Sequence, residues 1–162
     1  MFDSIDLTQI PKTAHAVAGY VGGAWPTDSH DALRAKFPHA FVVSIAVNGT
    51  ERASFLDVEN GDASVADVPN WLRDGINSGE VRPGIYGSQY TMNILKPLLI
   101  GIPRWKYRLW IASPNGLGAA QILLTQGYGA CQFDWNYLGR DLDASLCKPG
   151  FFTEHEYPLL SV

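Results

Sequence analysis

Two carboxylic acids, Asp57 and Glu59, lie in a segment that reads FLDVENG. Residues 53–58 are expected to form a β-strand, whose side chains alternate between two faces. Asp57 and Glu59 therefore point to one face, and Leu56 and Val58 point to the other, where helices should cover them. Like-charge repulsion and partial burial raise a carboxyl pKa, so this short segment can supply both an acid and a base.

The position of the pair allows two interpretations. Barrel enzymes place their catalytic groups at the carboxyl ends of the strands, which is where Asp57 and Glu59 are expected. In the simpler interpretation, both are solvated acids that precede a turn at Asn60 and Gly61, because acids at strand ends are common. The neighbouring segments of the sequence are needed to choose between the catalytic and the solvated interpretation.

Short apolar runs alternate with helical or loop segments along the chain, which is the pattern of an α/β protein. Strands are expected at residues 2–7, 16–21, 41–47, 53–58, 83–86, 107–112 and 130–135, the last of the series. Helices are expected at residues 28–37, 64–77 and 89–100, whereas 116–129 is ambiguous.

Seven or eight strands with three or four helices predict a compact (β/α)-barrel of the TIM type. A complete barrel of this type usually needs about 250 residues, so this chain of 162 residues should have a reduced number of helices, mainly lost in its last third. Residues 1–147 would form the barrel, and 148–162 a C-terminal tail packed on its outside. A doubly wound sheet competes, but no Gly-rich phosphate loop follows the first strand.

The net charge of −4 and a pI near 5.4 argue against a general nucleic-acid binder. Five basic residues do fall within residues 82–108. They could form a basic rim that meets an anionic polymer or, more simply, be scattered over a solvated surface. They are Arg82, Lys96, Arg104, Lys106 and Arg108. No apolar run reaches the ~18 residues of a membrane span, and we expect no membrane partner.

Cysteine and histidine positions do not predict a metal site, because no spacing among them resembles that of zinc ligands. We expect no metal and no cofactor. Cys131 and Cys147 fit a disulfide and two free thiols equally well. The N-terminus has neither the basic nor the apolar region of a signal peptide.

Several short motifs accompany the acid pair in a fixed order: IDLT at 5–8, RPGIY at 82–86, LWIA at 109–112, CQF at 131–133 and DLD at 141–143. This order resembles that of the glycoside hydrolase family 25 lysozymes. Their pattern is an Ile-Asp-Val-Ser opening, then Asp-x-Glu, Pro-Gly-Ile-Tyr, Leu-Trp-x-Ala and Trp-Gln-Tyr-like strands, and an Asp-containing segment. The chain looks closest to less-characterised glycoside-hydrolase-like barrels of actinobacteria and their phages.

The resemblance implies roles for four carboxyl groups. Glu59 would protonate the glycosidic oxygen, and Asp57 would stabilise the oxocarbenium-like centre or position the acetamido group of the substrate. Asp6 would match the first-strand carboxylate of the family, with Asp3 as the alternative. Asp141 would match the last one.

The same resemblance suggests residues that bind substrate. Tyr86 and Trp110 would line the sugar cleft by stacking. Gln132 and Asp134 share one strand face and would form either a structural hydrogen-bond pair or substrate contacts. Trp25 is equally suited to be a sugar platform or a loop anchor.

The implied function is a muramidase, or lysozyme-like glycoside hydrolase, that acts on peptidoglycan or a related polysaccharide. The bond would be the β-1,4 link after N-acetylmuramic acid, and synthesis in the cytoplasm would be followed by action at the cell wall. The alternative is a non-catalytic cell-wall or glycan-binding module of a phage virion or lysin. A purely structural domain is the third hypothesis. The oligomeric state is not predicted.

Overall fold

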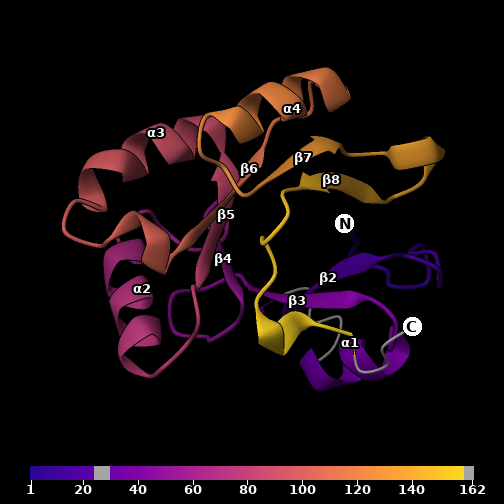
Figure 1. Cartoon of the computed structure of the whole chain (residues 1–162), viewed down its shortest axis with the longest axis horizontal. Helices are drawn as coiled ribbons and strands as arrows, with labels where there is room; N and C mark the ends of the chain where they lie inside the picture. Colours follow the sequence, from indigo (N-terminus) through magenta and orange to yellow (C-terminus); the bar gives the residue numbers. More distant parts are fainter. Residues whose placement is uncertain (24–29, 159–162) are drawn as a thin grey trace.

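A computed structural model describes residues 1–23 and 30–158, in which eight β-strands close into one barrel (Figure 1). The strands are β1 (Phe2–Asp3), β2 (Ala16–Val21), β3 (Phe41–Ala46), β4 (Phe55–Asp57), β5 (Gly84–Ser88), β6 (Arg108–Ala112), β7 (Ala130–Asp134) and β8 (Asp143–Cys147). Neighbours from β1 to β7 are parallel, whereas β8 runs antiparallel to both β7 and β1. The fold is therefore an α/β fold built on a closed, mixed barrel.

Among the described residues, four α-helices cover the outside of the barrel (Figure 1). They are α1 (His30–Lys36), α2 (Val68–Asn77), α3 (Gln89–Leu98) and α4 (Gly116–Thr125), which follow β2, β4, β5 and β6. Within the described residues, no α-helix lies in the β1–β2, β3–β4 or β7–β8 connections. The sequence suggested that the missing helices would be mainly those of the last third. In the structure, the connections without an α-helix are instead distributed along the chain. No described helix is long and apolar enough to cross a membrane.

Strand alternation separates an outer core from the barrel interior. Leu56 and Val58 are buried in the outer core beneath Trp71 and Leu72 of α2 and Met92 of α3. This confirms the prediction that helices cover them. Helix α3 begins after Ser88, whose side chain accepts a hydrogen bond from the Thr91 amide at 3.2 Å, and such an N-cap fixes the start of the helix.

Aromatic side chains fill the middle of the barrel. The Phe55 ring lies 5.6 Å from that of Trp110 in an edge-to-face arrangement and 5.4 Å from that of Phe151. The Trp110 indole donates a hydrogen bond to the Ser145 hydroxyl at 3.0 Å. The interior is therefore packed with side chains and is not a channel.

The C-terminal segment 148–158 closes the amino-terminal end of the barrel. Phe151 enters the interior core, and Glu156 forms a buried, two-pronged ion pair with Arg108 at 2.7 and 2.9 Å. The Thr153 amide also donates to Glu156, at 2.8 Å. The sequence predicted a tail packed on the outside, whereas in the structure this segment forms the floor of the barrel.

Strand β8 is missing from the sequence-based prediction, which ended the series at residues 130–135. The two cysteines lie on the neighbouring strands β7 and β8, with Cys131 paired in register with Leu146. Cys131 faces the outer core and Cys147 the interior, and both are free thiols.

Replacing Glu156 should destabilise the fold strongly, because Arg108 would remain charged and buried without its partner. We expect Glu156→Gln to lower the free energy of unfolding by about 3–5 kcal/mol, measured by denaturant titration. Glu80→Gln is the matched control, since the Arg52–Glu80 pair is about one-third exposed and should contribute under ~1 kcal/mol. Equal losses in the two variants would contradict the structural role of the buried pair.

Candidate active site

Carboxyl groups gather at the end of the barrel opposite this floor, which we call the mouth. Asp3 ends β1 and Asp57 ends β4, so both lie where parallel strands finish. Asp143 begins β8, which runs the other way, and it pairs in register with Asp3. Glu59 follows two residues after β4 ends. We call these four residues the carboxyl cluster.

Two members of the cluster are buried without full hydrogen bonding. Asp3 and Asp57 are 2% and 3% exposed. In each, the Oδ1 atom is buried and has no hydrogen-bond partner among the described residues. Buried polar atoms in proteins are nearly always paired, and an unpaired one is costly. The two oxygens therefore mark a position suited to binding a ligand rather than to stabilising the fold.

Burial makes Asp57 the group that holds a proton at neutral pH. Its pKa is raised to about 8 by burial first and then by the charges of Glu59, Asp62 and Asp3. The pKa of Glu59 is raised too, by partial burial and by Asp62. From the sequence we expected Glu59 to be the protonated member, and its raised pKa agrees with that expectation in direction. Asp57 is the more deeply buried of the two and its pKa is shifted in the same direction.

Asp143 and Asp3 are also shifted towards the neutral form. The pKa of Asp143 is raised to about 7, by burial and then by Asp141, against a hydrogen bond from Gln132 that lowers it. Burial, followed by the charge of Asp143, raises the pKa of Asp3. Adjacent like charges on paired strands repel, so the cluster retains protons that free carboxyl groups would lose.

A polar layer supports the cluster from below. The Tyr86 hydroxyl donates a hydrogen bond to the Gln132 side chain, which is itself hydrogen-bonded to Asp143. The Tyr86 ring packs on Trp110, with the ring centroids 4.6 Å apart. Burial, followed by the charge of Asp3, raises the pKa of Tyr20, so this phenol also borders the cluster in its neutral form.

A groove of about 620 Å³ opens beside the cluster, with Glu59 as one of its walls. Asp62 and the exposed ring of Tyr90 line the same groove, over an apolar base that includes Val65 and Ile94. Its size is within the ~300–1,000 Å³ range of small-ligand sites. Glu59 is thus the member of the carboxyl cluster that lines this groove.

Two predicted carboxylates lie outside the carboxyl cluster. Asp6 is exposed, and it accepts hydrogen bonds from the Thr8 amide and hydroxyl at 2.9 and 2.7 Å and from Gln9 at 3.2 Å. It therefore stabilises a turn, and Asp3 is the carboxyl of this region at the mouth. Asp141 is also exposed, and Asp143 takes the position expected for it.

The other predicted residues divide between the mouth and the core. Gln132 and Tyr86 lie in the polar layer. Trp110 has no exposed surface, so its ring is unable to stack on a sugar. Asp134 accepts a hydrogen bond from the Asn136 amide at 3.1 Å and caps a turn. Trp25 lies outside the described residues.

Some residues at the mouth were absent from the predicted site. Asp143 stands two residues before Ser145, and strand alternation would have placed both inside the barrel had β8 been recognised. Trp135 is 54% exposed just after β7, so an accessible aromatic ring does lie at this end. No sequence signal separates it from an ordinary surface tryptophan.

No protein-family model matches the chain, and no curated protein or solved structure does so either. Among the described residues, no group of three or more His, Cys, Asp and Glu side chains is placed to hold a metal ion. What the site offers chemically is a set of carboxyl groups in different protonation states, which is suited to acid–base chemistry.

The raised pKa of Asp57 should make the folded state less stable as pH rises. Below about pH 4, Asp57 is protonated in both the folded and the unfolded state. Between about pH 4 and 8 it ionises freely only in the unfolded state, so the folded state loses stability as the pH rises. Between pH 4 and 8, we expect the unfolding free energy of Asp57→Asn to rise relative to that of wild type by about 5 kcal/mol, because a shift of about four pKa units corresponds to that amount. Asp74→Asn, which alters an exposed carboxylate of α2, should show no such gain; an equal gain would disprove this expectation.

Proposed function

We propose that this protein is a peptidoglycan-directed glycoside hydrolase of the muramidase type. The observation that carries the proposal is the carboxyl cluster with its raised pKa values, next to a groove that reaches Glu59. Glycosidic bonds break through an oxocarbenium-like transition state, and enzymes meet it with one protonated carboxyl group and one carboxylate. The motif order that resembles family 25 lysozymes, in a closed α/β barrel with few helices, supports the choice of reaction.

Glu59 is the general acid in this proposal. It is the cluster member on the groove wall, and its raised pKa favours the protonated form that an acid requires. A polysaccharide in the groove would bring its glycosidic oxygen to this carboxyl group, which donates the proton as the bond breaks. The exposed rings of Tyr90 and Trp135 provide apolar surface for sugar faces near the mouth.

Asp57 is better suited to positioning the substrate than to stabilising charge. Since its pKa is raised to about 8, it is neutral at pH 7 and can donate a hydrogen bond from its O–H group. A carbonyl oxygen of an acetamido group is a matching acceptor, as on the sugars of peptidoglycan. Asp143, with a pKa of about 7, is half ionised at neutral pH and supplies the carboxylate of the pair.

Removing the proton of Glu59 should abolish most of the activity. We expect Glu59→Gln to slow the release of reducing ends from purified actinobacterial cell wall by at least ~10²-fold, the low end for general acid catalysis. Binding to the wall should remain, because the amide keeps the size and hydrogen bonding of the side chain. Glu154→Gln, an exposed site at the floor end, is the control and should act as wild type.

The hydrolase proposal fails if wild type and Glu59→Gln release no reducing ends and bind the wall equally. In that case the chain is a glycan-binding module, with the barrel kept and the chemistry absent. Failure of both hydrolysis and binding would remove the glycan hypothesis in either form.

Substitutions of Asp57 separate positioning from charge stabilisation. Asparagine keeps a hydrogen-bond donor, so we expect Asp57→Asn to lose less than ~10-fold in rate, whereas the isosteric Asp57→Leu should lose about 10²-fold or more. The wild-type rate should also fall above about pH 8, as Asp57 ionises, while Asp57→Asn loses less. Equal losses in both variants, with an unchanged pH profile, would instead assign Asp57 a charge-stabilising role.

A further inference from the structure

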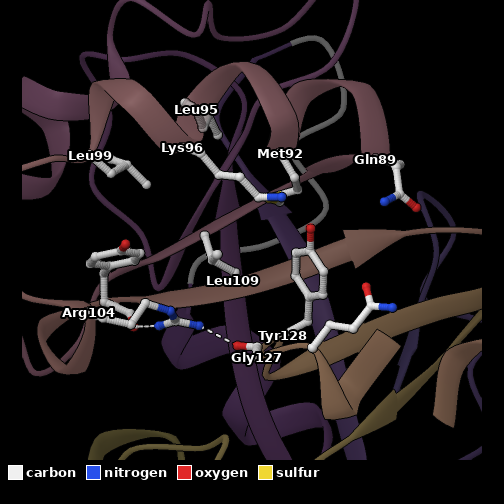
Figure 2. Close-up of a pocket in the computed structure, with 11 residues that line it drawn as sticks. Gln89, Met92, Leu95, Lys96, Leu99, Arg104, Leu109, Gly127 and Tyr128 are labelled. Atoms are coloured by element: carbon white, nitrogen blue, oxygen red, sulfur yellow. Dashed lines mark hydrogen bonds between the residues drawn. The ribbon is translucent and has the colours of Figure 1, made fainter. Parts of the chain in front are cut away.

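Two neighbouring pockets of about 240 Å³ each lie away from the mouth, along the outside of the barrel. One is between α3 and the turn that joins α4 to β7, and Figure 2 shows the side chains around it. The other extends towards the C-terminal segment at Lys148 and Phe151. Arg104, Tyr107 and Tyr128 line both, so the two pockets adjoin each other and share a wall.

Positive charge is concentrated in the second pocket. Its lining includes four cationic side chains and, among the described residues, no carboxylate. The cationic residues are Arg82, Arg104, Arg108 and Lys148. Glu156 neutralises Arg108 from behind, which leaves three positive charges without a counterion in the lining. The pKa of Arg82 is lowered by burial first and then by the charge of Arg108, as expected where cations crowd together. This excess occurs in a chain whose net charge is −4.

The arginines of this pocket are held in place by main-chain carbonyl groups. Arg104 donates to the carbonyl oxygens of Tyr107 at 2.8 Å and Gly127 at 2.5 Å. Arg82 donates to that of Gly150 at 2.8 Å, from a left-handed backbone with φ of 55° that L-residues rarely adopt. Carbonyl groups orient a guanidinium but do not cancel its charge. The Lys148 ammonium has no hydrogen bond to any described residue.

The first pocket supplies an apolar compartment with polar groups at its edge. Met92, Leu95, Leu99 and Leu109 form its apolar surface, and the buried phenols of Tyr107 and Tyr128 face it. In Figure 2, the Lys96 side chain extends over this space from α3. At about 240 Å³ it falls below the ~300–1,000 Å³ of drug-sized ligand sites, so an occupant is a small, ring-sized group.

We propose that the adjoining pockets bind a small phosphate monoester that carries an apolar ring. Its phosphate would face Arg104 and Lys148, and its ring would lie between α3 and Tyr128. Guanidinium groups bind phosphate with paired, charge-assisted hydrogen bonds. Several uncompensated cations favour a dianion over a monocarboxylate, because each adds Coulombic attraction. This site is separate from the carboxyl cluster and does not rest on the proposed function.

The sequence left the basic residues between Arg82 and Arg108 as a scattered surface or a rim for an anionic polymer. The structure gathers four of the five around these pockets, with Lys106 outside both linings. A small apolar compartment beside the charges suits a small ligand better than a polymer backbone.

Isothermal titration calorimetry with four probes tests the proposal: phenyl phosphate, inorganic phosphate, benzoate and benzyl alcohol. We expect phenyl phosphate to bind most tightly, the two other anions to bind about tenfold or more weakly, and the neutral alcohol not to bind. Affinity for phenyl phosphate should fall with added salt, since the attraction is electrostatic.

Lys148→Gln is the decisive variant, because no hydrogen bond of that side chain contributes to the fold. It should weaken phenyl phosphate about tenfold, while Arg73→Gln, which removes an exposed cation of α2, should leave the affinity unchanged. Equal affinity in wild type and Lys148→Gln, or tighter binding of inorganic phosphate than of phenyl phosphate, would overturn the proposal. Arg104→Gln, checked for folding by its thermal transition, should repeat the loss.

Discussion

Closure of the barrel by β8 is the constraint on which the rest of the structure depends. This strand pairs with both β7 and β1, so that no edge of the sheet is left open among the described residues. An open edge would expose unpaired main-chain groups to solvent or to another chain. Because β8 runs against its neighbours, its first residue, Asp143, arrives at the mouth, and its third, Ser145, meets Trp110 in the interior.

Buried polar groups of the barrel interior are paired at the floor, whereas some of those at the mouth lack hydrogen-bond partners. Arg108 and Glu156 neutralise each other at the floor, and aromatic rings fill the middle. At the mouth, Asp3 and Asp57 keep buried oxygens without partners. Proteins tolerate such groups where function needs them, and the remaining packing has to compensate for the loss of stability. The floor is therefore what allows the mouth to be electrostatically unfavourable.

Strong strand patterns were predictable from the sequence, and short elements were not. Residues 16–21 were predicted with the bounds that the structure gives β2, because a short apolar run that ends at two glycines is distinctive. The inward direction of Asp57 followed from alternation with Leu56 and Val58. Strand β8, reading DASLC, has too few apolar residues to stand out. Strand β1 was predicted, but over residues 2–7 instead of the two residues that the structure gives it. Both owe their strand form to pairing with distant neighbours. Asp141 was chosen from the family resemblance, and with β8 unrecognised no sequence pattern favoured Asp143 over it. The buried position of Trp110 depends on which strands surround it.

Among the described residues, the C-terminal segment closes the barrel at the floor, so that a ligand approaches the carboxyl cluster from the mouth. With Phe151 inserted and Arg108 paired across the base, nothing can be threaded through the strands from end to end. Any polymer that meets the carboxyl cluster has to lie across the mouth, and its two ends can extend indefinitely in solvent on either side. For the proposed hydrolase, such a geometry places no requirement on a free chain end, so it suits attack at internal positions of a cross-linked network. Both fragments would then leave sideways, by the route along which the intact chain arrived.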